Sequence, residues 1–244
     1  MPTVEGAGVP LHYAVRGDGP PVLLVHGLAS DGTAMAPVAE AVAAAGGRAI
    51  AYDRRGYGES GAPEPYHGTT VEEQAEDAAA LLRALDTGPA VVAGDGFGAL
   101  VALDLAKRHG GLVRALALSN PALFALVPEA TEILSAQRAE IEEALRAGGP
   151  AAGVEAWLGG RVEGEALERA RAGHRGFFAD YAGLATWATS RRELRALAFP
   201  AVVLTGPSSP PHVVAAADGL AGLLPDATRS GDGDLAGAVV RLLR

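Results

Sequence analysis

Short apolar runs alternate along the chain with longer stretches in which apolar residues recur every three or four positions. The first pattern predicts buried strands and the second predicts amphipathic helices. Strands are predicted at residues 9–16, 21–25, 48–52, 91–95, 114–118 and 200–205, with a weak one at 227–229. Helices are predicted at residues 33–45, 71–85, 97–105, 213–224 and 235–243. This alternation predicts an α/β protein with a mostly parallel, doubly wound sheet.

The pattern changes after residue 120, where only helical periodicity is found up to about Arg195. Four of the ten Phe and Tyr residues and both Trp residues lie between Phe124 and Trp187. These aromatic side chains either pack a helical insert onto the rest of the protein, which we prefer for any single one, or contact a ligand. The sequence predicts a core of residues 1–120 and 196–244 and a helical cap of residues 121–195.

Composition narrows the class of protein. With 244 residues, 49% of them hydrophobic and 20% charged, the chain is long enough for one globular domain and its cap. It has no apolar run of membrane-spanning length, no cysteine, and neither a basic nor an apolar start at residues 1–5. We therefore expect a cytoplasmic protein without membrane attachment. The net charge of −9 and the scattered lysines and arginines disfavour a nucleic-acid partner.

Residues 91–100 form an apolar run, a glycine-rich turn and the start of a helix. This is the layout of a nucleophile elbow, in which a G-x-S-x-G sequence holds a catalytic serine on a strained turn. Gly94 and Gly98 supply the small residues that the close backbones require, but Gly96 stands at the centre. A shifted register with Asp95 as nucleophile puts Phe97 where a small residue is needed. The sequence therefore predicts an elbow without a nucleophile.

Three motifs in order resemble the α/β-hydrolase superfamily: a strand ending in His26-Gly27, the loop from Asp53-Arg54 to Ser60, and the glycine-framed elbow. The resemblance covers nearly the whole chain. It implies the α/β-hydrolase fold, with the helical cap inserted after the sixth strand.

The same resemblance implies where the other two members of a catalytic triad belong. The acid position falls in the loop 206–212, where Ser209 stands, and an alternative acid position falls at Ser119-Asn120. The histidine position falls in residues 230–234 and places Asp234 there. With nucleophile, acid and histidine all replaced, we expect a degenerate triad and no acyl-enzyme, because a hydroxyl nucleophile needs a base and an orienting group.

An oxyanion hole needs only backbone donors, so it can persist without the triad. The resemblance implies that the N–H groups of Phe97 and Leu28 form it, next to His26, Gly27 and Gly96. An anion or a polarised carbonyl could bind there, particularly at a helix N-terminus. The alternative is that the turn is retained only because the sheet requires it.

Two carboxylates are the candidate catalytic groups. Asp234 would act as a general acid or base if it faces a desolvated pocket, but the Gly-Asp-Gly-Asp sequence also suits a residue that caps the last helix. Asp95 is a second candidate, and we expect it more readily to cap the elbow helix. The histidines are single and scattered, so no metal is expected, and nothing indicates a cofactor. His212 is noted because its loop belongs to the expected site.

Three functions stay open at this point. The first is a lyase, isomerase or cyclase acting without a covalent intermediate on an apolar small molecule that carries a carbonyl or carboxylate. The second is a pseudoenzyme that binds a ligand or a protein partner. The third is a hydrolase in which Asp234 or His212 activates water directly. The oligomeric state is not predicted.

Overall fold

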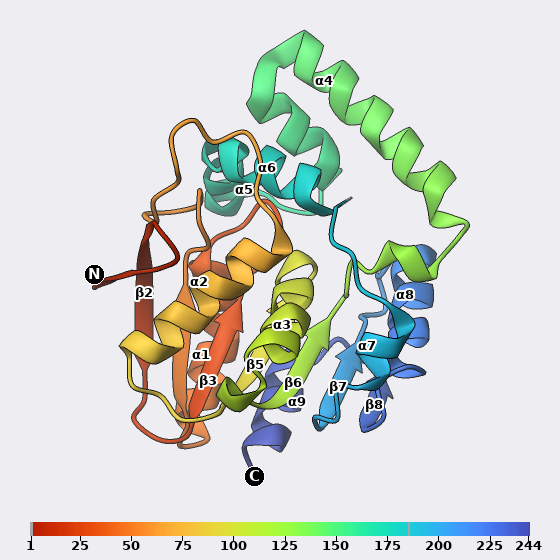
Figure 1. Cartoon of the computed structure of the whole chain (residues 1–244). Coiled ribbons are helices and arrows are strands. Elements are labelled where there is room, and N and C mark those ends of the chain that lie inside the picture. The colour runs from red at the N-terminus through yellow and green to blue at the C-terminus, as the bar shows by residue number, and fades with distance from the viewer. Residues whose placement is uncertain (1, 185) are drawn as a thin grey trace.

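The computed structural model describes residues 2–184 and 186–244, so Met1, part of the N-terminal stretch considered above, lies outside it. In this described part of the chain, eight strands form one sheet in the order β1-β2-β4-β3-β5-β6-β7-β8 (Figure 1). β1 and β2 run antiparallel to their neighbours and the remaining pairs are parallel, as predicted. The strands are β1 (Thr3–Glu5), β2 (Pro10–Arg16), β3 (Pro21–Val25), β4 (Arg48–Tyr52), β5 (Ala90–Asp95), β6 (Val113–Ser119), β7 (Ala201–Leu204) and β8 (Ala227–Ser230). The sequence pattern missed β1, because three residues are too few to show a periodicity.

The helices that alternate with these strands lie close to their predicted positions. They are α1 (Ala36–Ala44), α2 (Val71–Ala84), α3 (Phe97–Arg108), α8 (Pro211–Ala221) and α9 (Leu235–Leu243). The structure adds α7 (Arg191–Arg195) and the 3-10 helices η1 (Gly32–Met35), η2 (Gly110–Leu112) and η3 (Phe124–Leu126), which were not predicted as separate elements. The start of α2 is fixed by a capping box. The Thr70 hydroxyl accepts from the Glu73 amide at 3.1 Å, and the Glu73 carboxylate accepts from the Thr70 amide at 2.9 Å.

Successive residues of the strands face opposite sides of the sheet, and each side is covered by helices. Leu23 and Val25 of β3 belong to the larger apolar cluster with α2, α3 and part of α8. Val22 and Leu24 belong to a second cluster, which α1 and α9 cover. Because both faces are buried, the central strands read as continuous apolar runs rather than alternating ones.

Between β6 and β7 the longer elements are all helical, as predicted: α4 (Ala130–Leu158), α5 (Gly164–Ala172) and α6 (His174–Leu184), followed by α7. In Figure 1, α4, α5 and α6 lie together above one end of the sheet. The first part of α4 runs from Ala130 to Gly148. Gly149, with φ of 78°, then breaks the helical backbone before Pro150.

The C-terminal end of this insert packs on the main body of the protein. Trp187, Leu194 and Leu197 are buried in the same cluster as the central strands. The Trp187 indole donates to the carboxylate of Asp104 in α3 at 3.1 Å. The division into a core of residues 1–120 and 196–244 and a cap of residues 121–195 stays a prediction.

In residues 2–184 and 186–244, every helix is either too short or too polar to span a lipid bilayer.

Candidate functional site

The elbow is present and its centre is open. β5 ends at Asp95, Gly96 has φ of 55° and ψ of −111°, and α3 begins at Phe97. A Cβ atom added to Gly94 would lie 2.2 Å from the carbonyl oxygen of Gly98, so helix and strand are in direct backbone contact. A Cβ atom added to Gly96 would have no atom within 4 Å. The close frame and the empty central position both agree with the sequence analysis.

The loops that follow β3 and β5 meet at the point where the strand order reverses. From β3 the chain first adds β4 on one side and then β5 on the other. In open α/β sheets ligands bind in the crevice at such a switch point, beyond the carboxyl ends of the strands. Leu28 follows β3, and Phe97 follows β5 across the elbow. Within the described residues neither amide donates a hydrogen bond to another group.

Arg54 fixes the orientation of the loop after β3. Its Nε donates to the carbonyl of His26 at 2.9 Å, and its Nη2 donates to the carbonyl of Gly27 at 2.8 Å. In a trans peptide the C=O and N–H groups point in opposite directions, so the Leu28 N–H is turned away from Arg54. The guanidinium therefore holds this amide in one orientation. It also lies over the rings of Tyr57 and Phe97, 4.9 Å from each centroid.

A fully buried ion pair joins Arg54 to the helical insert. Arg54 Nη1 donates to Asp180 Oδ2 in α6 at 2.7 Å, and both side chains are 0% exposed. The hydroxyl of Tyr57 donates to Asp180 Oδ2 at 2.9 Å, and the amide of Gln74 donates to Asp180 Oδ1 at 2.5 Å. The loop after β3 is thus connected through one arginine to the helices above it.

His26 has a structural role. Its Nε2 accepts from the Arg54 amide at 3.0 Å, and its Nδ1 lies 2.9 Å from the Gly27 carbonyl, which places the ring proton on Nδ1. Burial, and secondarily the charge of Arg54, holds the pKa of His26 well below its usual value. The ring is therefore neutral, and it braces the loop without titrating near pH 7.

Asp95 lies at the end of β5, and the structure corrects its expected role as a helix cap. The N-cap of α3 is Gly96, which makes no side-chain capping bond. The Asp95 Oδ1 instead accepts from the Ser119 hydroxyl at 2.7 Å and from the Asn120 amide at 3.1 Å. A Cβ atom added to Gly27 would lie 3.2 Å from Asp95 Oδ2, so the second oxygen faces the loop after β3. Burial raises the pKa of Asp95.

This raised pKa predicts how Asp95→Asn changes stability with pH. Because the pKa in the folded protein lies above its ordinary value of 3.8, folding stability is lost as pH rises through the folded pKa. The Asn variant keeps the acceptor oxygen and carries no charge. Its free energy of unfolding should therefore exceed that of the parent at pH 7, and the difference should vanish toward pH 4. Denaturant titrations across this range measure it, and a difference independent of pH would contradict the assignment.

Asp234 caps the last helix rather than facing a closed pocket. It is exposed, and its Oδ1 accepts from the Gly237 amide at 2.8 Å at the start of α9. Its carboxylate thus makes the capping interaction that was the alternative to a catalytic role. The expected catalytic role depended on desolvation of this carboxylate, and the carboxylate is exposed to solvent. A catalytic role for Asp234 stays an untested prediction. His212 lies in the first turn of α8, with its ring 5.4 Å from that of Phe124.

Ser209, at the expected acid position, is part of a polar chain across the strand ends. Its hydroxyl donates to Asn120 Oδ1 at 2.7 Å and accepts from the Gly206 amide at 2.9 Å. Ser209 and Asn120 therefore occupy both positions where the resemblance implied an acid, and they contact each other.

The aromatic residues of the insert pack mainly on one another. Phe177 is fully buried, and the rings of Trp157, Phe178 and Tyr181 lie 5.1 to 5.7 Å from it. Leu28 packs against this cluster, so the insert covers the loop that carries the unpaired amide. These side chains therefore pack mainly within the insert, whereas we expected them to pack the insert onto the rest of the protein.

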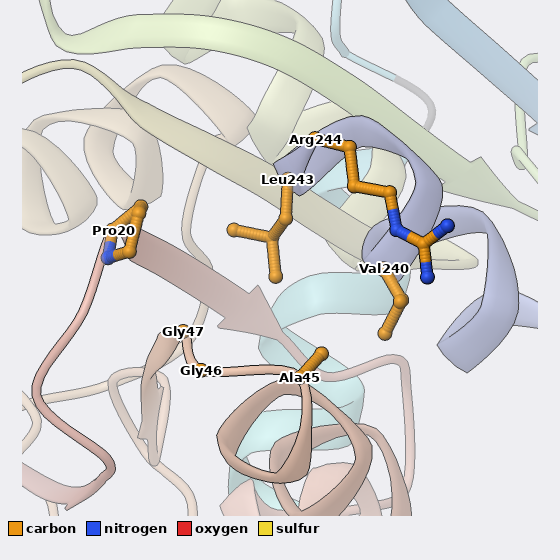
Figure 2. A pocket seen from close by; sticks show the side chains of 7 residues that line it. All are labelled: Pro20, Ala45, Gly46, Gly47, Val240, Leu243 and Arg244. Carbon is orange, nitrogen blue, oxygen red and sulfur yellow. The ribbon is translucent and has the colours of Figure 1, made fainter.

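Two surface pockets lie away from the elbow. One, of about 250 Å³, is lined by Pro20, the turn at Ala45–Gly47 and the end of α9, next to the amino end of β3 (Figure 2). The other, of about 370 Å³, lies between residues 64–67 and α6. Neither is lined by Asp95, Gly96 or Leu28. The described part of the chain also contains no group of three His, Cys, Asp or Glu residues that could hold a metal.

Sequence reasoning missed the partners of these groups. Asp180 stands among Phe177, Phe178 and Tyr181, and a charged residue within an aromatic helix could have indicated a buried cation as its partner. Asn120 has φ of 45°, a conformation that Asn adopts more readily than most residues, but this is visible only in the structure.

Comparison with known proteins agrees with this geometry. The alpha/beta hydrolase fold family matches residues 20–179. The uncharacterized hydrolase YraK of Bacillus subtilis is 37% identical over 51% of this chain and 46% of its own length. The bifunctional epoxide hydrolase 2 of Sus scrofa is 34% identical over 46% of this chain and 20% of its own length. The matches therefore span less than half the length of these relatives.

Solved structures match over the whole chain. An alpha/beta hydrolase from Sphaerobacter thermophilus superposes with a TM-score of 0.80 at 26% identity, covering 100% of both chains. A thermophilic esterase from Thermogutta terrifontis superposes with a TM-score of 0.78 at 27% identity, covering 100% of this chain and 97% of its own. From the elbow, the sheet order and these matches together, the chain belongs to the alpha/beta hydrolase fold family.

Proposed function

We propose that this protein binds an apolar small molecule with a carbonyl or carboxylate group at the elbow and acts on it without an acyl-enzyme, as a lyase, isomerase or cyclase would. The observation that carries the proposal is Gly96: the elbow keeps its strained turn and its open space, but no side chain is present to attack. The amides of Leu28 and Phe97 supply donors for the ligand oxygen.

The elements that maintain this site support a retained binding function. Arg54 donates hydrogen bonds to the carbonyls of His26 and Gly27 and to Asp180 of the insert, and these contacts require a charged side chain to be buried, which is unfavourable. Such an arrangement exceeds what the turn alone requires, because the close backbone contact that Gly94 and Gly98 permit already defines the elbow. It favours a site whose donors are kept in place over a turn kept only for the sheet.

Direct hydrolysis is a second candidate, favoured by the names of the relatives. YraK, the epoxide hydrolase and the Thermogutta esterase are all described as enzymes that cleave with water. In this chain such chemistry would need a carboxylate to activate water in the space at Gly96. Asp95 is the nearer candidate, because its Oδ2 faces the loop after β3.

Stopped-flow hydrolysis of p-nitrophenyl butyrate separates these functions. We expect no burst of p-nitrophenol from the parent protein and none from Gly96→Ser, since no base and orienting group accompany the new hydroxyl. A steady rate above buffer that is lost in Asp95→Asn or in Asp234→Asn would instead establish water activation by that residue. A burst equal to the protein concentration in the parent would overturn the proposal, because it requires a covalent intermediate.

A further inference from the structure

A chain of hydrogen bonds runs across the ends of β5, β6 and β7, and the donor and the acceptor of each bond can be assigned. The Gly206 amide donates to the Ser209 hydroxyl, so the proton of that hydroxyl is directed to Asn120 Oδ1. This fixes which end of the Asn120 amide is the oxygen, since only the oxygen can accept. The Nδ2 group must then face Asp95 Oδ1, where it donates at 3.1 Å.

The chain ends on one oxygen of one carboxylate. Asp95 Oδ1 receives both the Asn120 amide and the Ser119 hydroxyl, whereas Oδ2 receives no hydrogen bond from any residue of the described chain. Asp95 is half-buried, and its Oδ2 is not among the unpaired side-chain atoms that the described residues bury completely. A carboxylate held by one oxygen and free at the other has a fixed orientation and an available lone pair.

The free oxygen contacts the loop that carries one unpaired amide and is close along the chain to the other. Oδ2 is adjacent to Gly27, and the next residue supplies the Leu28 N–H. On the other side, Asp95 is separated from Phe97 only by Gly96, whose missing side chain leaves open space. A proton acceptor therefore lies next to the loop that carries the Leu28 amide, and it is two residues along the chain from the Phe97 amide and one from the open space at Gly96.

The charges of Arg54 and Asp95 favour a neutral ligand over an anionic one at this site. The Arg54 guanidinium is already committed through Nε, Nη1 and Nη2 to His26, Asp180, Gln74 and Gly27, and so supplies no free cation. A carboxylate ligand would place a second negative charge next to Asp95, which is unfavourable in a partly desolvated site. A neutral carbonyl group avoids this repulsion and still uses both amides.

We propose that Asp95 Oδ2 is the catalytic base of this site and that Asn120 and Ser209 position it. The substrate is a neutral carbonyl compound with a C–H bond on the carbon next to the carbonyl. This inference rests on the proposed function and names its substrate class. Oδ2 takes the proton from that carbon, and the C–H electron pair forms the C=C bond of an enolate. The enolate oxygen accepts hydrogen bonds from the Leu28 and Phe97 amides. Asp95 then returns the proton to carbon, so no other reactant is consumed.

The test uses phenylacetone, whose CH₂ group lies next to a neutral carbonyl, and phenylacetate as the matched anion. Incorporation of deuterium from D₂O into phenylacetone is followed by proton NMR, and binding of both probes is measured by ligand-detected NMR. We expect exchange well above buffer, a loss of at least about 100-fold in Asp95→Asn, and binding of phenylacetone in preference to phenylacetate.

The positioning residues have their own readout. Asn120→Ala should lower the exchange rate at saturation by about tenfold or more, because it removes a hydrogen bond to a charged group, and leave the saturation constant for phenylacetone unchanged. Ser209→Ala should lower the rate less, and Ser209→Thr should restore it. The control is Ser135→Ala, an exposed serine on α4 that bonds only to the Thr131 carbonyl. A purely structural role would change binding and stability together.

The outcomes separate this inference from the proposed function. Exchange that persists in Asp95→Asn, or binding of phenylacetone with no exchange, overturns Asp95 as base and leaves ligand binding at the elbow intact. Preference for phenylacetate overturns the neutral substrate class alone. Absence of both binding and exchange overturns the proposed function as well.

Discussion

Gly94→Ala is expected to destabilise the protein by about 4 kcal/mol or more, or to prevent its folding. The new Cβ atom would lie 2.2 Å from the Gly98 carbonyl oxygen and 2.6 Å from the Ala99 amide nitrogen. Both are backbone atoms of α3, which cannot move without separating the helix from the central strand. The free energy of unfolding, from urea denaturation followed by circular dichroism, measures the loss.

Gly96→Ala is the matched control for the elbow. It adds the same methyl group two residues along the chain, where no atom lies within 4 Å. Only the backbone conformation, with φ of 55° and ψ of −111°, opposes it, at a cost of about 1–3 kcal/mol. Equal losses for the two variants would mean that the helix and strand are not in the close contact described above.

Asp180→Ala is expected to destabilise the protein by about 3–5 kcal/mol. The substitution leaves the Arg54 guanidinium buried without its counter-charge and removes the acceptor for Tyr57 and Gln74. Asp180→Asn should cost less, because it keeps acceptor capacity while losing the charge. The same denaturation measurement applies, and hydrogen exchange of the Leu28 amide should accelerate as the loop after β3 loses its anchor.

A second ion pair on the insert provides the comparison. Arg138 and Glu142 lie one turn apart on α4, and both are largely exposed to water. Glu142→Ala should leave the unfolding free energy nearly unchanged, since exposed pairs contribute little. If Asp180→Ala behaved like this control, the pair with Arg54 would not connect the insert to the core.

The fold could be predicted from sequence because its signals are local. The apolar runs at 21–25 and 48–52, the capping box at Thr70 and the glycine-framed elbow each specify an element without reference to distant residues. The α/β-hydrolase fold then follows from the resemblance of three motifs, taken in order along the chain, to that superfamily. Among the strands of the described residues, β1 alone was missed, because a three-residue edge strand depends on its partner for its existence.

From the sequence, only those parts of the site could be predicted that depend on backbone groups rather than on side-chain contacts. Gly96, Leu28 and Phe97 were placed by their position in the elbow and the loop after β3. The hydrogen bonds of Asp95 were not predictable, because its partners Ser119 and Asn120 lie more than twenty residues away in sequence, whereas a cap on the last helix was one of the two roles predicted for Asp234. Asn120 and Ser209 lie 89 residues apart, and no periodicity brings them together. Asp180 and Arg54 are 126 residues apart for the same reason.

The central claim is that the vacancy at Gly96 is a ligand site, and the most direct measurement of it is the affinity for phenylacetone of Gly96→Leu and Gly96→Ala. Both variants carry the same backbone strain, but only leucine fills the open space. We predict binding at least tenfold weaker in Gly96→Leu than in Gly96→Ala, with both proteins folded by circular dichroism. Equal affinity in the two variants would contradict the claim, because the ligand would then bind elsewhere.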